Sequence, residues 1–253
     1  MLWYLANGSL NDYLKSQVLL QGNYYTGQVA QLAKAEFSSN TGASQFDGFS
    51  LANLDNAKQA NVLSVDKISA QLAPVAMSQL NSGSVGQKNT TIVHVETLTL
   101  SHLQVWREKV NQGNNLAILL ERITMQLAKD YPALYPEISA KNYAKAHPEQ
   151  NEQLALQKLA NQEKVLETNQ AVIASKKEKQ KKRLLGKAQI RVIISSIVIE
   201  KLTFNDINKE TNQEFSNVEL GSLGGELGLD SNQLGGELLR VILTDLTEDK
   251  LEK

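Results

Sequence analysis

Two segments of the sequence carry the same pattern of apolar residues, and this repeat limits the fold more than any other feature. The first segment has Val93, Val95, Leu98, Leu100, Leu103 and Val105, and the second has Val192, Ile194, Ile197, Ile199, Leu202 and Phe204, an offset of 99 at every position. Within each segment, apolar residues occur in pairs two positions apart, such as Val93 and Val95. The next pair begins three positions after the last residue of the previous one, at Leu98 in this case, and we call this a step of three. A regular strand turns successive residues to opposite faces, so the extra residue returns the next pair to the same face, as a β-bulge or a tight kink does.

A third segment follows the same rhythm, with Leu63, Val65, Ile68, Ala70 and Leu72. The sequence therefore predicts three copies of a bent, half-buried strand, the alternative being a chance pattern in a β-rich chain. The aliphatic side of these strands is a candidate either for a closed core or for an open groove that holds an acyl chain. Its candidate residues are Val93, Val95, Leu98, Leu100, Ile194, Ile197 and Ile199.

The segments around these strands have helical or hairpin patterns. Leu10, Leu14 and Val18 recur every four residues after Ser9, a good N-cap, and predict a helix that stops at Gly22. Further helices are expected after Asn114 or Asn115 and from Asp230 or Ser231 onward, and short alternating stretches between residues 26 and 72 indicate hairpins. We expect an α+β fold with a curved, mostly antiparallel β-sheet, bulged strands, N-terminal and C-terminal helices and a polar helical insertion.

The insertion is expected because the composition changes sharply at residues 141–187, which are rich in Lys, Gln, Glu, Asn and Ala. Leu159, Leu166 and Ile173 are spaced by seven, but the matching positions Gln162 and Asn169 are polar, which does not suit a stable coiled coil. We therefore divide the chain into four parts. These are a membrane-proximal helix (1–22), the first part of a sheet domain with a helix (23–135), a helical or disordered insertion (136–187), and the rest of the sheet domain with a final helix (188–253).

Composition excludes several classes of protein. The 253 residues include no cysteine, so disulfides, thiolate metal sites and thiol nucleophiles are absent. The 26 Lys and Arg residues balance 27 Asp and Glu residues, so we expect no nucleic-acid partner. No run approaches 18 apolar residues, so the sequence predicts no transmembrane helix.

No group of residues has the spacing of a catalytic or metal site. His94 and His102 are expected on opposite sides of a kinked strand, and His147 lies in the insertion. The glycines at 221, 224, 225 and 228 lack the G-x-G-x-x-G spacing of a phosphate-binding loop, which favours a simple connection. We expect no catalytic residue, metal or cofactor, and a hydrolase or transferase with an unrecognised site is the least favoured class.

One run of basic residues stands out in charge. It could contact an anionic partner such as lipid headgroups or nucleic acid, or it could be the solvated end of a polar helix, which its lack of interleaved aromatic residues favours. The residues of this candidate patch are Lys176, Lys177, Lys179, Lys181, Lys182 and Arg183.

The order of several short motifs is similar to that of a known family. The motifs are Leu-Trp-Tyr-Leu-Ala-Asn at residues 2–7, GNYYTG at 22–27, Phe49–Asn53, Val62–Leu72, the strands Thr91–Val105 and Arg191–Phe204, Asn115-Leu116 with its helix, and Val218–Leu246. In this order they resemble the N-terminal region of AsmA-like envelope proteins over roughly residues 1–128 and 188–246. The family's membrane anchor is not in this sequence, and residues 141–187 look like an insertion.

The resemblance implies a non-enzymatic protein on the periplasmic side of the bacterial inner membrane that contributes to lipid handling or assembly. It implies phospholipid, the membrane surface or envelope proteins as partners, and no catalytic residues to carry over. Trp3, Tyr4 and Leu5 form an aromatic cluster typical of a membrane interface, placed where the relatives' anchor ends, so an anchor is expected upstream of Met1. The alternative is a protein–protein interaction or scaffold module without lipid binding.

Overall fold

The computed structural model describes residues 2–74, 90–110, 113–139 and 189–247, with side chains of the first helix described from Leu10 onward. The chain divides into two compact units, residues 1–123 with 189–253 and residues 124–188. The first unit holds the sheet and the candidate sites. The predicted insertion at 136–187 falls in the second unit, and from residue 140 it lies outside the described residues.

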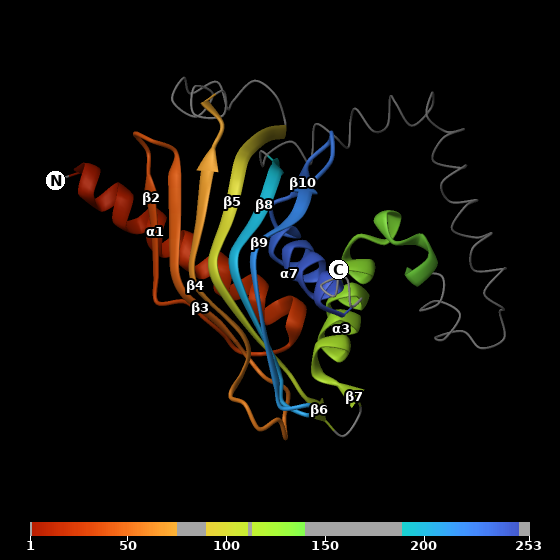
Figure 1. Cartoon of the computed structure of the whole chain (residues 1–253). Coiled ribbons are helices and arrows are strands. Elements are labelled where there is room, and N and C mark those ends of the chain that lie inside the picture. The colour runs from red at the N-terminus through yellow and green to blue at the C-terminus, as the bar shows by residue number, and fades with distance from the viewer. Residues whose placement is uncertain (1, 75–89, 111–112, 140–188, 248–253) are drawn as a thin grey trace, which may run out of the picture. The chain divides into compact units, whose positions relative to one another are not determined.

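Eight strands form one sheet, in the order β1–β3–β4–β5–β8–β10, with β2 beside β3 and β9 beside β8. Their bounds are β1 Ala30–Gln31, β2 Lys34–Ser38, β3 Ala43–Ala52, β4 Asn61–Leu72, β5 Thr90–Arg107, β8 Gln189–Asp206, β9 Thr211–Leu223 and β10 Leu229–Asp230. A small hairpin of β6 (Lys109–Val110) and β7 (Gly113–Asn114) follows β5. Figure 1 shows the curvature of the large sheet, and the predicted α+β class with a curved, mostly antiparallel sheet is confirmed.

The offset of 99 residues in the sequence repeat matches the register in which the two central strands pair. Strands β5 and β8 run parallel, and every residue of β5 in the ladder pairs with the residue 99 positions later, from Thr90 with Gln189 to Arg107 with Asp206. On its other side β5 pairs antiparallel with β4, so the three bent strands predicted from the sequence are neighbours. The parallel pair was not predicted. It requires a crossover connection, which the chain between β5 and β8 supplies.

At each step of three, the residue pairing between neighbouring strands is interrupted. Between Thr90 and Arg107 the β5–β8 ladder omits only two pairs, Glu96 with Ser195 and Ser101 with Glu200, and both fall at a step of three. The second interruption continues into the outer strands, where Gly48 of β3 and Asn217 of β9 have positive φ values of 64° and 55° and also lack a ladder partner. The sheet therefore bends along one line that crosses five strands, and the aliphatic residues keep to one face across it.

The first helix, α1 (Leu2–Thr26), is longer at both ends than the sequence predicted. It begins before the expected cap at Ser9 and continues through Gly22, so both predicted limits were wrong. Gly22 does not end the helix. It lies where α1 packs closely against β1, since a Cβ at Gly22 would lie 2.7 Å from the Cβ of Ala30 in β1. Helix α1 thus approaches the sheet at a contact where only glycine fits.

Helix α1 lies along the edge formed by β1 and β2. Three of its side chains bind backbone groups of that edge: Asn11 Oδ1 accepts from Phe37 N–H (3.0 Å), Lys15 Nζ donates to the Ala33 carbonyl (2.8 Å) and Asn23 Oδ1 accepts from Ala30 N–H (2.6 Å). An uncovered edge strand presents unpaired backbone groups to other chains. The helix satisfies part of that edge.

The last helix, α7 (Leu234–Thr247), docks on α1 through two glycines. A Cβ at Gly235 would lie 2.8 Å from Gln21 Oε1, and one at Gly236 would lie 2.8 Å from the Tyr25 ring. The Gly235 N–H donates to Gln21 Oε1 (2.7 Å), and the Tyr25 hydroxyl donates to the Asn232 carbonyl (3.0 Å). The cost of glycine in a helix is offset here by the close approach of the two helices.

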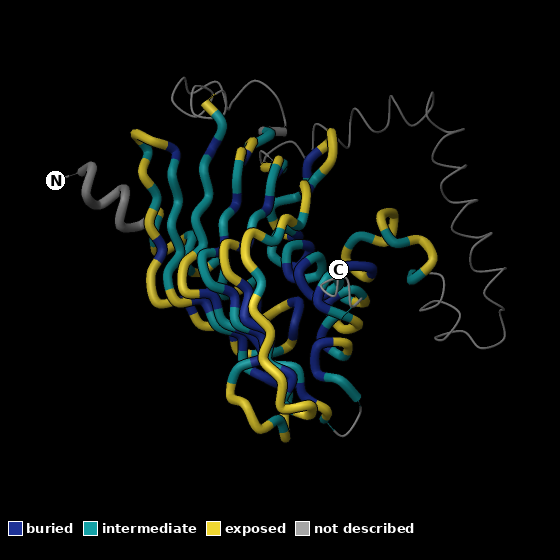
Figure 2. The backbone as a smooth tube through the Cα atoms, in the orientation of Figure 1, coloured by how far each residue is buried: buried dark blue, intermediate teal, exposed yellow. Residues whose placement is uncertain are grey.

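The core lies between the sheet and the helices. Helices α1 and α7 are on the same side of the sheet (Figure 1), and buried residues occur both in the strands and in α7 (dark blue in Figure 2). The third helix, α3 (Asn115–Asp130), begins in the first unit, where its first turns bury Leu116, Leu119 and Ile123. Helix α7 contributes buried Leu239, Ile242, Leu243 and Leu246.

Candidate functional site

The aliphatic face of β5 and β8, the first candidate site, is buried. Leu100, Ile197 and Ile199 are at most 1% exposed, and only Val93 of the seven predicted residues is half-buried rather than buried. The remaining members, Val95, Leu98 and Ile194, are at most 7% exposed. The side chains on this face therefore form the core of the first unit, packed beneath the helices.

A second apolar surface lies on the outer side of α1 and was missed by the sequence reasoning. Tyr13 and Leu20 are both 58% exposed, Tyr24 is 51% exposed and Leu10 is 36% exposed. Their spacings of three, seven and four place them on one side of a helix. We call these four residues the α1 stripe. The spacing is visible in the sequence, but the repeat of four residues predicted Leu10, Leu14 and Val18 as the apolar side, and Leu14 and Val18 are half-buried.

The predicted membrane-proximal residues Trp3, Tyr4 and Leu5 lie in α1, in the part whose side chains are not described. Among the residues that the structure describes, no helix has both the length and the apolar content needed to cross a membrane.

A pocket of about 460 Å³ lies on the outer face of the sheet, over the part of β2, β3, β4 and β5 before the bend. The strand registers place its outer side chains in two rows: Glu36, Gln45, Ser69 and Thr99 in one row, and Ser38, Ala43, Gln71 and Thr97 in the other. Asn11 of α1 and the intervening residues Phe37, Ser44 and Ala70 complete the lining. Thr97 and Thr99 alternate with Leu98 and Leu100, so this face is opposite to the core.

The pocket is polar and close to neutral. Glu36 is its one ionisable residue, and its carboxylate pairs with Lys34 at 2.7 Å. Lys34 donates a hydrogen bond to the Glu36 carboxylate, and this bond, followed by the charge of Glu36, raises the pKa of Lys34 above its ordinary value of 10.5. The other lining side chains offer hydroxyl and amide groups.

Beyond the bend, the outer face carries ionisable groups together with a row of hydroxyl and amide residues, Ser50, Ser64, Gln104 and Thr203. His102 contacts Asp66 through Nδ1 (3.1 Å) and Thr203 through Nε2 (3.0 Å). An acid, an imidazole and a hydroxyl in a chain are the groups of a nucleophilic triad. However, Asp66 is well exposed and none of the three residues lines the pocket. We interpret these contacts between Asp66, His102 and Thr203 as a cross-strand network that stabilises the bend.

A buried polar network joins the end of β5 to the start of α3. Glu108 accepts hydrogen bonds from Asn53, Lys58 N–H and Gln59 N–H at 2.7–2.9 Å. Asn115 donates to Asn53 (3.0 Å). These bonds satisfy both carboxylate oxygens of a residue that is 3% exposed, so the network holds structure together.

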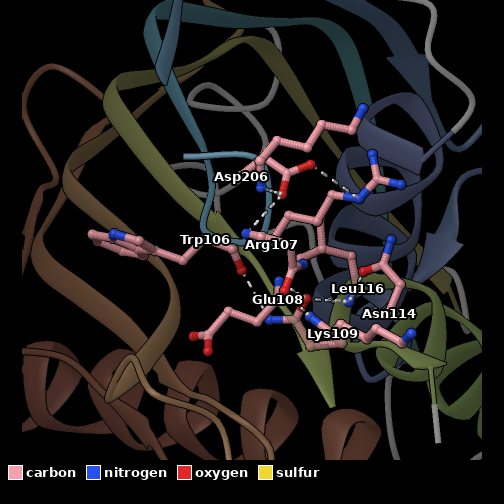
Figure 3. A network of polar contacts seen from close by, with 10 residues as sticks. Trp106, Arg107, Glu108, Lys109, Asn114, Leu116 and Asp206 are labelled. Carbon is pink, nitrogen blue, oxygen red and sulfur yellow. Dashed lines mark hydrogen bonds and ion pairs between the residues drawn. The ribbon is translucent and has the colours of Figure 1, made fainter. Parts of the chain in front are cut away.

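Figure 3 shows the neighbouring part of this network, at the ends of β5 and β8. The Arg107 guanidinium reaches the Asp206 carboxylate (3.9 Å), and Asp206 also accepts the N–H groups of Asn208 and Lys209. The Trp106 indole points away from the cluster. The contacts fix the turn after β8 and leave no carboxylate directed at an open site.

The remaining predicted features are placed as follows. His94 is exposed on β5. Gly221 lies within β9, where it pairs with Ile197, whereas Gly224, Gly225 and Gly228 lie in the connection between β9 and β10, and all four glycines have positive φ values. The basic patch from Lys176 to Arg183 and His147 lie outside the described residues. Within the described ranges, no three His, Asp or Glu side chains are grouped so that they could hold a metal ion.

Comparisons with protein-family models, with curated proteins and with solved structures found no match for this chain.

Proposed function

We propose that this chain is a non-enzymatic module that binds a membrane surface through α1 and contributes to assembly or lipid handling there. The observation that carries the proposal is the α1 stripe, in which Leu10, Tyr13, Leu20 and Tyr24 are exposed on one side of a helix. The opposite side of α1 is fixed to the sheet edge by Asn11, Lys15 and Asn23. The stripe is therefore directed away from the protein's own core.

The chemistry of the stripe suits the boundary between headgroups and acyl chains. Tyrosine places an apolar ring and a polar hydroxyl side by side, and leucine adds apolar area. Asp12 and Lys15 are the only acidic and basic residues in the sequence of α1, so their formal charges balance. Binding would accordingly depend on apolar contact more than on anionic headgroups, and it should change little with salt.

Lipid handling in this proposal takes place outside the sheet. Burial of Leu98, Leu100 and Ile197 leaves no space for an acyl chain at those positions. The resemblance to AsmA-like proteins supports a location on the periplasmic side of the inner membrane, with phospholipid as the partner.

Flotation with phosphatidylcholine vesicles tests the proposal. The unaltered chain should float with the vesicles, and the double variant Tyr13→Glu/Leu20→Glu should stay in the dense fraction while keeping its circular dichroism spectrum. Leu227→Glu is the matched control, because Leu227 is 76% exposed in the β9–β10 connection and should tolerate the same change. Equal flotation of all three proteins would overturn the proposal.

A second candidate is the interaction module without lipid binding, and it is favoured by β9. Among the described strands β9 pairs only with β8, and most of its residues are exposed. A free strand edge can accept an extended segment of a partner. Adding such a partner should slow hydrogen exchange at the β9 amides, and this reading predicts that the α1 variants bind it normally.

A further inference from the structure

We propose that the pocket over β2–β5 binds an uncharged, hydroxyl-rich ligand, namely an oligosaccharide. The proposal stands apart from membrane binding by α1, because no residue of the α1 stripe lines the pocket.

The lining supplies the hydrogen-bonding groups that a sugar needs. A sugar hydroxyl both donates and accepts, so its best partners are groups that do the same or that come as donor–acceptor pairs. Hydroxyls are supplied by Ser38, Ser69, Thr97 and Thr99, and amides by Asn11, Gln45 and Gln71. The register places Ser69 beside Thr99 and Gln71 beside Thr97, so hydroxyl and amide groups converge on one area of the face.

The charge of the pocket selects against ionised ligands. Glu36 is already paired with Lys34, so the lining has no unpaired cation or anion to offset the desolvation of a charged ligand. Outside the pocket the same face carries charged residues: Lys34, Asp47 and Lys67 form a neighbouring row, and Lys201 pairs with Glu214 beyond the bend. The lining itself is mainly neutral and polar.

The shape and rigidity of the pocket also fit a small oligosaccharide. Its volume of about 460 Å³ lies within the roughly 300–1,000 Å³ typical of ligand sites. Ser38 and Ala43, the small members of the second row, line the pocket together with Gln45 and Gln71.

Several lining groups are held in place before a ligand arrives. The Gln45 amide donates to both Asp47 oxygens (2.8 and 3.0 Å), and the Gln71 amide donates to the Thr41 carbonyl (2.8 Å). The β-branched side chain of threonine restricts χ1 at Thr97 and Thr99. Groups that are already ordered lose less entropy on binding, which raises the affinity.

Titration of the ¹⁵N-labelled chain with maltotriose and with tri-N-acetylchitotriose tests the proposal. At least one trisaccharide should produce saturable shifts confined to amides of residues 36–45, 69–71 and 97–99. The double variant Thr97→Val/Thr99→Val keeps the shape and strand preference of these residues but removes two hydroxyls. It should weaken binding roughly tenfold, equivalent to about 1.4 kcal/mol.

Thr211→Val, on the exposed part of β9, is the matched control and should bind as the unaltered chain does. The Thr97→Val/Thr99→Val variant should also float with vesicles normally, which separates this proposal from membrane binding. The proposal is overturned if neither trisaccharide gives saturable shifts, if the shifts fall outside the pocket, or if the double variant binds with unchanged affinity.

Discussion

The molecule has two apolar surfaces of similar chemistry and opposite exposure. On the inner face of β5 and β8, Leu100 and Ile197 are at most 1% exposed, whereas Tyr13 and Leu20 of the α1 stripe are 58% exposed. Apolar periodicity marks both surfaces in the sequence, but it does not show which surface another element covers. Which segments dock decides which surface is covered, so the sheet face is core and the stripe is exposed.

The docking side of α1 explains the difference. Helix α1 reaches the sheet edge through polar side chains and reaches α7 through Gln21 and Tyr25 at the two glycines of α7. These contacts fix how the helix is rotated about its axis. In this orientation of the helix, the side chains of Tyr13 and Leu20 are exposed to solvent.

The largest expected effect comes from placing a charge on the inner face. Leu98→Asp should unfold the first unit or cost more than about 4 kcal/mol, because the carboxylate would be buried without a partner. His94→Asp is the control, since His94 is exposed on the same strand and should change stability little. Urea denaturation measures both. A folded Leu98→Asp variant of normal stability would show that the inner face is not closed core.

A smaller effect is expected where the two helices meet. Gly236→Ala should destabilise the protein by about 1–3 kcal/mol, because the new Cβ would lie 2.8 Å from the Tyr25 ring. In an open helix the same change would stabilise by about 1 kcal/mol. The sign of the change in thermal melting temperature therefore tests the docking of α7 on α1, and an increase would contradict it.

The smallest expected effects compare single truncations on the two apolar surfaces. Ile197→Val removes one buried methyl group and should cost about 1 kcal/mol. Leu20→Ala removes more apolar area but should change the free energy of unfolding by less than about 0.5 kcal/mol, because the side chain is mostly exposed. Chemical denaturation compares the two, and a larger loss for Leu20→Ala would place the stripe in the core.

Part of this architecture could be predicted from the sequence because strand periodicity is local. The step of three at Val95–Leu98 indicated the bends, and the offset between Val93 and Val192 matched two strands that proved to be neighbours. The offset did not reveal that they run parallel, since an antiparallel pair could carry the same pattern. The predicted end of α1 at Gly22 was wrong because tertiary packing with β1 outweighed the local signal.

The candidate sites were harder to predict for a different reason. The two rows of the pocket bring together residues from four strands, and only the register shows that Ser69 lies beside Thr99 and Gln45. The spacing of Leu10, Tyr13, Leu20 and Tyr24 is visible in the sequence, but their exposure depends on the rotation that docking gives to α1.

The most direct test of the central claim is the depth of the α1 stripe in a bilayer. The chain has no cysteine, so Leu20→Cys and Leu227→Cys each accept a single nitroxide spin label at a defined site. With phosphatidylcholine vesicles, we expect the label at position 20 to become accessible to oxygen and shielded from a water-soluble nickel complex, while the label at position 227 stays aqueous. Labels that both remain fully accessible to the nickel complex would contradict membrane binding through α1.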